Sequence, residues 1–127
     1  MKKKTCDLTT EEINFAVAYL EKVEVDINSS TFDDYLNESC DWNPCFHWSQ
    51  GGPIIERERI HLDAWDDKPN WLASSGDVYI ARDNINETGT TPLIAAMRYY
   101  VLNKLGSEVD MQEIFRDLQI KMELHNE

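Results

Sequence analysis

The chain has 127 residues, a formal net charge of −12 and 42% hydrophobic residues. This length favours a single domain over residues 1–127 with a hydrophobic core of its own, and the composition excludes an intrinsically disordered protein. The acidic balance excludes direct binding to a nucleic-acid backbone, because like charges repel each other. It leaves open a basic partner, or imitation of a nucleic acid.

The acidic residues are concentrated in the first third of the chain. From Asp7 to Cys45 there are ten Asp and Glu residues and one basic residue, Lys22. Such a surface usually keeps a protein soluble, and a docking face for a partner is the alternative. No apolar run follows the lysines at positions 2–4, and no stretch of about 20 apolar residues occurs. We therefore expect a cytoplasmic protein that does not contact a membrane.

The first helix is indicated by a capping box. Thr9 and Glu12 have the required spacing, with 1–8 as an N-terminal segment before them. Apolar residues then recur on one helical face and predict a helix from Thr10 to Lys22. Strict alternation over 23–28 predicts a short half-buried strand. We expect residues 29–43 to form an acidic loop with one helical turn at Phe32–Leu36.

The middle of the chain carries strand and turn signals. A strand is predicted to begin at Pro53-Ile54-Ile55 and to continue or turn back through Arg59–Leu62. The turn formers at 66–70 predict a hairpin connection to a strand at Trp71–Ala73. The remaining expectations are a turn at 74–77, a third strand at Val78–Arg82 and a loop at Asp83–Gly89.

The clearest helix follows this region. Thr91 suits the N-cap, Pro92 the first helical position and Gly106 the C-terminal end. The residues between them are apolar almost all round, which predicts a buried central helix. Asp110 begins a last, peripheral helix that covers 111–127.

The order of these elements predicts an α+β fold. A small, mostly antiparallel sheet should pack against the buried central helix, with further helices near both ends of the chain.

Three separated motifs resemble a known family. They are Asn43-Pro44-Cys45, then Pro53-Ile54-Ile55 with Arg59-Ile60, then Pro92-Leu93-x-Ala95-Ala96-Met97. In this order and spacing they resemble the NinX-like family of small accessory proteins of tailed phages, over about residues 42–110. Other members of the family carry a tryptophan where this chain has Gly52. The resemblance implies a phage protein that acts in the cytoplasm of its bacterial host, and it implies no catalytic residues.

The stretch from Trp42 to Leu62 holds the candidate site. It contains two of the four tryptophans and two of the three histidines. The sequence Gln50-Gly51-Gly52-Pro53 is typical of a tight bend, and its glycine amides could instead receive an anion or a nucleotide-like group. Trp48 could stack on a flat ligand or anchor a protein interface, or it could pack in the core.

Two arginines are candidates to bind an anion. Arg59 would lie beside the glycines, and Arg98 interrupts the apolar central helix. Arg59 could grip an anionic ligand or a carboxylate bidentately, and Arg98 could line a pocket. The alternatives are a turn near Arg57 that removes Arg59 from the apolar face, and pairing of Arg98 with an acidic side chain or with solvent.

The cysteines and histidines support weaker hypotheses. Cys40, Cys45, His47 and His61 could form a zinc site, but the gap between the cysteines is wide for a compact one. A nucleophilic Cys45 with a histidine base would lack a third orienting group. We therefore expect no metal, no cofactor and no catalytic residues.

These observations lead to three functional hypotheses. The first is a non-enzymatic protein that inhibits or redirects a host protein, such as a component of antiviral defence. The second is a binder that sequesters a nucleotide-like ligand among Trp48, Gly51, Gly52, Arg59 and Arg98. Together with Gln50, these are the six candidate ligand- or partner-binding residues. The third is an enzyme that uses Cys45 or the histidines. Self-association is compatible with each of them.

Overall fold

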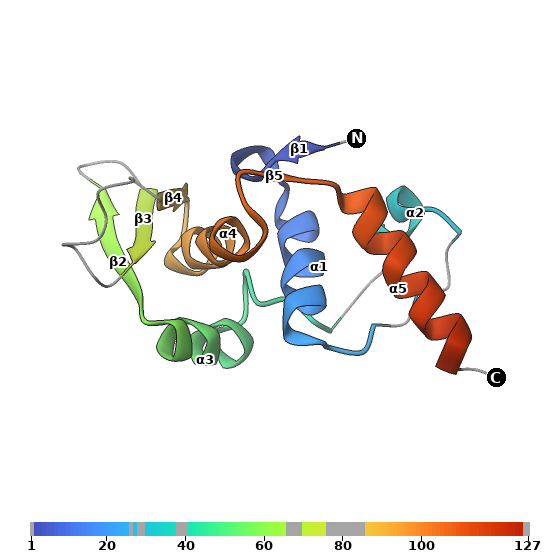
Figure 1. Cartoon of the computed structure of the whole chain (residues 1–127). Helices are drawn as coiled ribbons and strands as arrows, with labels where there is room; N and C mark the ends of the chain where they lie inside the picture. The colour runs from blue at the N-terminus through green and yellow to red at the C-terminus, as the bar shows by residue number, and fades with distance from the viewer. Residues whose placement is uncertain are drawn as a thin grey trace.

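Figure 1 shows the computed structural model of the chain, which describes residues 2–25, 27, 30–37, 41–65, 70–75 and 86–125. In this part of the chain the elements, in order, are β1 (Lys3–Lys4), the 3-10 helix η1 (Thr5–Asp7), α1 (Thr10–Glu21), α2 (Phe32–Leu36), α3 (Trp48–Glu58), β2 (Ile60–Trp65), β3 (Asn70–Ser75), β4 (Asn86–Gly89), α4 (Pro92–Leu105), β5 (Glu108–Val109) and α5 (Met111–His125). The strands form two small antiparallel sheets. The predicted α+β class is confirmed.

Helix α4 lies at the centre of this arrangement. It contacts β2, β3 and β4 as well as α1 and α3, and Figure 1 shows it between the larger sheet and α1. The Thr91 hydroxyl accepts a hydrogen bond from the Ile94 amide at 3.2 Å, and Gly106 ends the helix with φ of 95°. Eight of its fourteen residues are buried. The prediction of a buried central helix is therefore confirmed.

The larger sheet has the strand order β2-β3-β4. Pairing of β2 with β3 confirms the predicted antiparallel hairpin, although the connection at 66–69 lies outside the described residues. The strand predicted at Val78–Arg82 also lies outside them. The loop predicted up to Gly89 is wrong for its last four residues, which form β4, and β3 continues through the turn predicted at Ser74 and Ser75.

The sequence signal for β4 is weak because packing creates this strand. The segment Asn-Glu-Thr-Gly has little strand propensity. It pairs with β3 and lies against α4, where Gly89 comes so close that a Cβ atom would stand 2.5 Å from the Ala95 amide nitrogen. Glycine therefore fits where the strand meets the helix.

An aromatic cluster joins α1, α2 and α5. The Phe15 ring lies 5.1 Å from those of Phe32 and Tyr35 and 6.1 Å from that of Phe115, between centroids. These contacts explain why the short α2, the helical turn expected at Phe32–Leu36, forms within an acidic segment. The Asp110 carboxylate accepts a hydrogen bond from the Glu113 amide at 3.1 Å and begins α5 as predicted.

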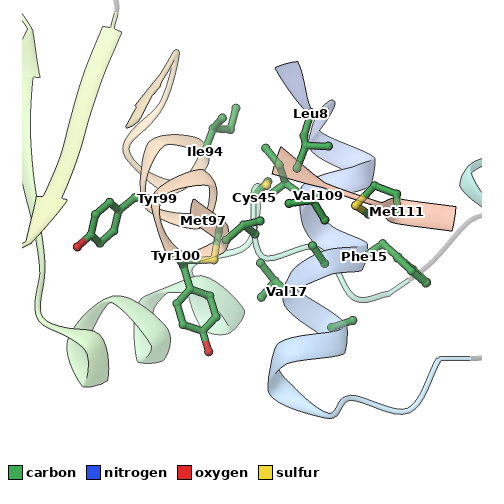
Figure 2. Close-up of a cluster of buried hydrophobic side chains, with 14 of the residues drawn as sticks. Leu8, Phe15, Val17, Cys45, Ile94, Met97, Tyr99, Tyr100, Val109 and Met111 are labelled. Atoms are coloured by element: carbon green, nitrogen blue, oxygen red, sulfur yellow. The ribbon is translucent and has the colours of Figure 1, made fainter. Parts of the chain in front are cut away.

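The second half of the core lies between α4 and α1. Figure 2 shows Met97 of α4 beside Val17 of α1, with Cys45 above them and Tyr100 pointing downward from α4. Met97 and Val17 are fully buried. Burial of a side chain of this size stabilises the fold by roughly 1.5–3 kcal/mol, so these contacts hold α1 against α4.

The strand predicted at 23–28 is not observed in the residues described there. Val23 to Val25 and Ile27 belong to no sheet. Val25 is buried, while Val23 and Ile27 pack partly against the core. The alternation therefore reflects side chains that are buried on an irregular segment, and it does not specify a strand for this segment to pair with.

The strand predicted to begin at Pro53 is wrong, because residues 48–58 form α3. Pro53 lies inside this helix, and Arg59 ends it in the left-handed region with φ of 53°. The turn that was the alternative near Arg57 is thus found at Arg59, where β2 starts. Tertiary contacts override the weak local helix signal here, since Ile54 is buried and Ile55 packs against the core.

A polar cluster ties the C-terminal end of α3 to α1 and α4. Both terminal nitrogens of the Arg57 guanidinium donate to the Glu21 carboxylate at 2.8 Å, and the Tyr100 hydroxyl donates to Glu21 at 2.6 Å. Glu58 accepts from Arg57 at 3.0 Å and pairs with Lys104 at 3.1 Å. Arg57 is thereby engaged within the fold.

No helix in the described part of the chain has the length and apolar character needed to span a bilayer.

The Glu21 carboxylate gives the fold a predictable pH dependence. Hydrogen bonds from Arg57 hold the pKa of Glu21 below its ordinary value of 4.5. Because the pKa of Glu21 is lower in the folded state than in the unfolded state, its carboxylate stabilises the fold at a pH above the unfolded-state pKa. This stability is lost as the pH falls through the folded-state pKa. We predict that Glu21→Gln lowers the free energy of unfolding at pH 7 by about 1 kcal/mol, a value reduced because Arg57 is half exposed.

Urea denaturation at several pH values checks this prediction. The difference between wild type and Glu21→Gln should shrink progressively below pH 4.5. Glu56→Gln is the matched control on exposed α3 surface and should change stability by less than about 0.5 kcal/mol. A difference for Glu21→Gln that does not vary with pH would contradict the assigned role of the ion pair.

Candidate functional site

The segment that leads into α3 is attached to α1 through Asn14. The Asn14 side-chain amide donates to the Asn43 side-chain oxygen at 2.6 Å, and its own oxygen accepts from the Cys45 backbone amide at 3.0 Å. The Trp42 indole donates to the Asn14 backbone carbonyl at 3.0 Å. One residue in the middle of α1 thus fixes three positions of this segment.

The Gln50 side chain closes the same segment from the other end. Its oxygen accepts from the Asn43 amide at 2.5 Å, and its nitrogen donates to the Asp41 carbonyl at 2.8 Å. The Asn43 carbonyl in turn accepts from the Phe46 and His47 amides. Gln50, predicted as a binding residue, therefore has both side-chain groups engaged with the backbone, where they hold the turn before α3.

Gly51 permits a close contact between α3, the turn and α4. A Cβ atom at this position would stand 2.7 Å from both the Leu93 Cδ2 atom and the Pro44 carbonyl oxygen. The Gly51 amide donates to the His47 carbonyl at 3.0 Å. This N–H group is consequently engaged in the helix, and the two motifs that contain Pro44 and Leu93 meet at Gly51.

Phe46 and Trp48 are large apolar side chains on the surface. Phe46 is 54% exposed and Trp48 is 56% exposed, on either side of the exposed His47. In the described part of the chain Ile120, on α5, is the other large hydrophobic residue with comparable exposure. We call these two aromatic residues the Phe46–Trp48 surface. It lies on the segment that Asn14 and Gln50 hold in place.

Gly52 lies next to this surface. A Cβ atom there would meet the Trp48 ring at 3.9 Å, an ordinary van der Waals distance, and no nearer atom. Trp48 and Gly52 are therefore neighbours, one helical turn apart on α3. Of the six predicted site residues, these two are brought together at the surface.

The two predicted arginines lie in different surroundings. Arg59 is exposed at the C-terminal end of α3, eleven residues after Trp48. Arg98 is partly buried and donates to the Thr88 carbonyl at 2.5 Å and to the Leu8 carbonyl at 3.1 Å. Its Nε atom is buried without a hydrogen-bond partner among the described residues. Arg98 therefore joins α4 to β4 and to Leu8, the residue that ends η1, by hydrogen bonds to backbone carbonyls in place of the expected acidic partner.

Two cavities lined by described residues lie elsewhere. One of about 160 Å³ is bordered by Glu11, Asn14, Phe15, Tyr35, Leu36, Trp42 and Asn43. The other, of about 350 Å³, is bordered by Lys2, Lys3, Glu12, Phe32, Asp33, Met111 and Gln112. Neither includes any of the six predicted residues, so sequestration of a nucleotide-like ligand stays a prediction.

The cysteine and histidine side chains lie in unlike environments. Cys45 is buried, and burial raises the pKa of its thiol to about 12, so the neutral thiol dominates at physiological pH. His47 is exposed, and His61 lies 2.9 Å from the Asp63 carboxylate. Cys40 is outside the described residues. Among those described, no group of three or more His, Cys, Asp or Glu side chains could hold a metal ion.

Asn14 does not stand out as a site residue in the sequence. What could have indicated its role is its position in the sequence, next to the buried Ile13 in the apolar helix α1. A polar side chain on a buried helix needs a hydrogen-bond partner, so such an asparagine predicts a contact with another segment. The partner is a turn 29 residues further along the chain, which no local pattern specifies.

The comparisons with known proteins identify one family. The family model described as Bacteriophage P22, NinX matches residues 4–104. The match extends much further toward the N-terminus than the resemblance over residues 42–110, and so includes α1 and its Asn14. A search of the curated proteins finds no match.

The two adjacent glycines of α3 should respond oppositely to the same substitution. We predict that Gly51→Ala lowers the free energy of unfolding by about 1–3 kcal/mol, because the added methyl group overlaps Leu93 and Pro44. Gly52→Ala should raise it by roughly 0.5–1 kcal/mol, because alanine favours the helix and the site has room. Thermal and urea denaturation measure both effects, and equal effects of the two substitutions would contradict the close packing at Gly51.

Proposed function

This chain belongs to the Bacteriophage P22 NinX family, and we propose that it acts as a non-enzymatic binding protein that inhibits or redirects a protein of the bacterial host. The proposed class of target is a component of host antiviral defence, by analogy with other small accessory phage proteins. The function of the family is unknown, so the support for this proposal comes from the surface of the molecule.

The observation that carries the proposal is the exposure of the Phe46–Trp48 surface on a fixed segment. Contact between an aromatic side chain and water is unfavourable, so its burial against a partner favours binding. Tryptophan is among the residues that most often dominate the binding energy of protein interfaces. Asn14 and Gln50 hold the backbone amides of Cys45 and Asn43, just before Phe46, and Gln50 itself lies two residues after Trp48. Little ordering entropy would then be lost on binding, which favours affinity.

The charge of the molecule indicates the chemistry of the partner. The net charge of −12 would attract a basic protein surface and speed its association at low salt. Described acidic residues of the first third, such as Asp33 and Asp34, are exposed on α2. The proposal therefore assigns binding energy to the aromatic residues and steering to the acidic ones.

Capture from host lysate tests this proposal. We predict that a host protein is retained by the tagged wild-type chain and is lost with the Phe46→Ser/Trp48→Ser double variant. With the purified pair, Trp48→Ser alone should weaken binding about 30-fold, because a tryptophan at an interface centre contributes about 2 kcal/mol. Calorimetry on the purified pair gives this ratio directly.

The matched control is Ile120→Ser, which removes another exposed apolar side chain of similar accessibility from α5. This control should leave capture and affinity unchanged. Equal losses of host-protein capture in the control and in the double variant would indicate non-specific hydrophobic binding and would contradict the proposal. Light scattering that shows a Trp48-dependent dimer without any host protein would assign the surface to self-association instead.

A further inference from the structure

Packing does not explain why residue 52 is a glycine. It lies in the interior of α3 with a helical backbone, where glycine destabilises a helix relative to alanine. Unlike Gly51, it has room for a methyl group, since the nearest atom to a Cβ there is the Trp48 ring at 3.9 Å. The fold therefore does not require glycine at this position, and a side chain there would contact the Trp48 ring.

A carboxylate lies on the other side of Gly52. Trp48, Gly52 and Glu56 follow one another at four-residue spacing, so they share one face of the helix. Trp48 and Glu56 start about 12 Å apart along the axis. The indole lies against Gly52, and the Cα–Cβ bond of Glu56 tilts toward the helix N-terminus and hence toward Gly52. We call this arrangement the Trp48–Gly52–Glu56 notch.

Glu56 is available for a partner. Its side chain is exposed, and no ion pair joins it to another residue that the structure describes. The neighbouring Arg57 and Glu58 differ in this respect, because they pair with Glu21, with Lys104 and with each other. Glu56 is thus an exposed carboxylate on the same helix face as the exposed Trp48 ring, two helical turns further along α3.

An aromatic face and a carboxylate at this spacing match one ligand chemistry. A guanidinium group is planar, stacks on an indole and forms paired hydrogen bonds with a carboxylate. The net charge of −12 adds a general attraction for cations. Resting on the proposed function, we infer that the Trp48–Gly52–Glu56 notch receives an arginine side chain of the host protein.

A titration with a small arginine peptide tests the notch without the host protein. The probe is acetyl-Gly-Arg-Gly-amide, and the full-length chain is labelled with ¹⁵N for NMR at low salt. Addition should shift the Trp48 indole signal, assigned with Trp48→Phe, together with the Glu56 amide. The matched peptide with citrulline in place of arginine has the same shape without the charge. It should produce less than about a tenth of the shift, as expected for losing a charge-assisted contact.

Two variants separate the notch from a general effect on the fold. Glu56→Gln should weaken binding of the arginine peptide about five- to tenfold and leave the melting temperature of the protein unchanged. Gly52→Ala should also weaken it, because the methyl group covers the ring, while raising the melting temperature by about 3 °C. If Gly52 had only a structural role, Gly52→Ala would not raise the melting temperature and weaken binding of the arginine peptide at the same time.

The outcomes distinguish this inference from the proposed function. Equal binding of the arginine and citrulline peptides, or binding that Glu56→Gln leaves intact, would overturn the notch. Loss of host-protein capture in Trp48→Ser but not in Glu56→Gln would likewise reject the notch and keep the Phe46–Trp48 surface. Arginine binding at Trp48 with no host protein captured would support the notch and contradict the proposed function.

Discussion

The hydrogen bonds of the Asn14 side chain are the constraint on which the surface of this protein depends. Its amide nitrogen and oxygen bind Asn43 and Cys45, and the backbone carbonyl of the same residue accepts the Trp42 indole. A partly buried amide left without partners would be costly, so the turn and α1 stabilise each other. This contact explains how a short irregular segment can hold Phe46, and the start of α3 with Trp48, exposed to water.

The residues of the family motifs meet at the same place. Pro44 and Leu93 approach Gly51 from two sides, and Cys45 is buried beneath the turn. Figure 2 shows Cys45 in the core that also contains Met97 of α4. The motif residues therefore pack against α3 and hold it in place. The exposed surface is formed by residues near them in the sequence, namely Phe46, Trp48 and Gly52.

Local signals predicted those parts of the fold that local interactions determine. The Thr9–Glu12 capping box and the Thr91, Pro92 and Gly106 signals gave α1 and α4 nearly to the residue, because caps satisfy backbone groups within one turn. Helix α3 was misassigned because Gly-Gly-Pro and the alternating charges of 56–59 favour a bend and a strand. Contacts with Leu93 and Glu21, distant in sequence, decide its conformation.

The candidate site was predicted in part for the same reason. The sequence indicated that Trp48 and the glycines form a special segment, and Trp48 and Gly52 do lie together at the surface. It could not show that Gln50 and Gly51 support the backbone, or that Arg98 binds carbonyl groups of two other segments. These roles depend on distances between residues far apart in the chain.

Through these hydrogen bonds, Asn14 holds the segment that bears Phe46 and leads into Trp48. Hydrogen–deuterium exchange of Asn14→Ala, compared with the exposed control Asn103→Ala on α4, tests it most directly. We expect faster exchange at the amides of Asn43, Cys45 and Phe46 in Asn14→Ala alone, with the interior of α4 still protected. Unchanged protection of the Cys45 amide in Asn14→Ala would contradict it.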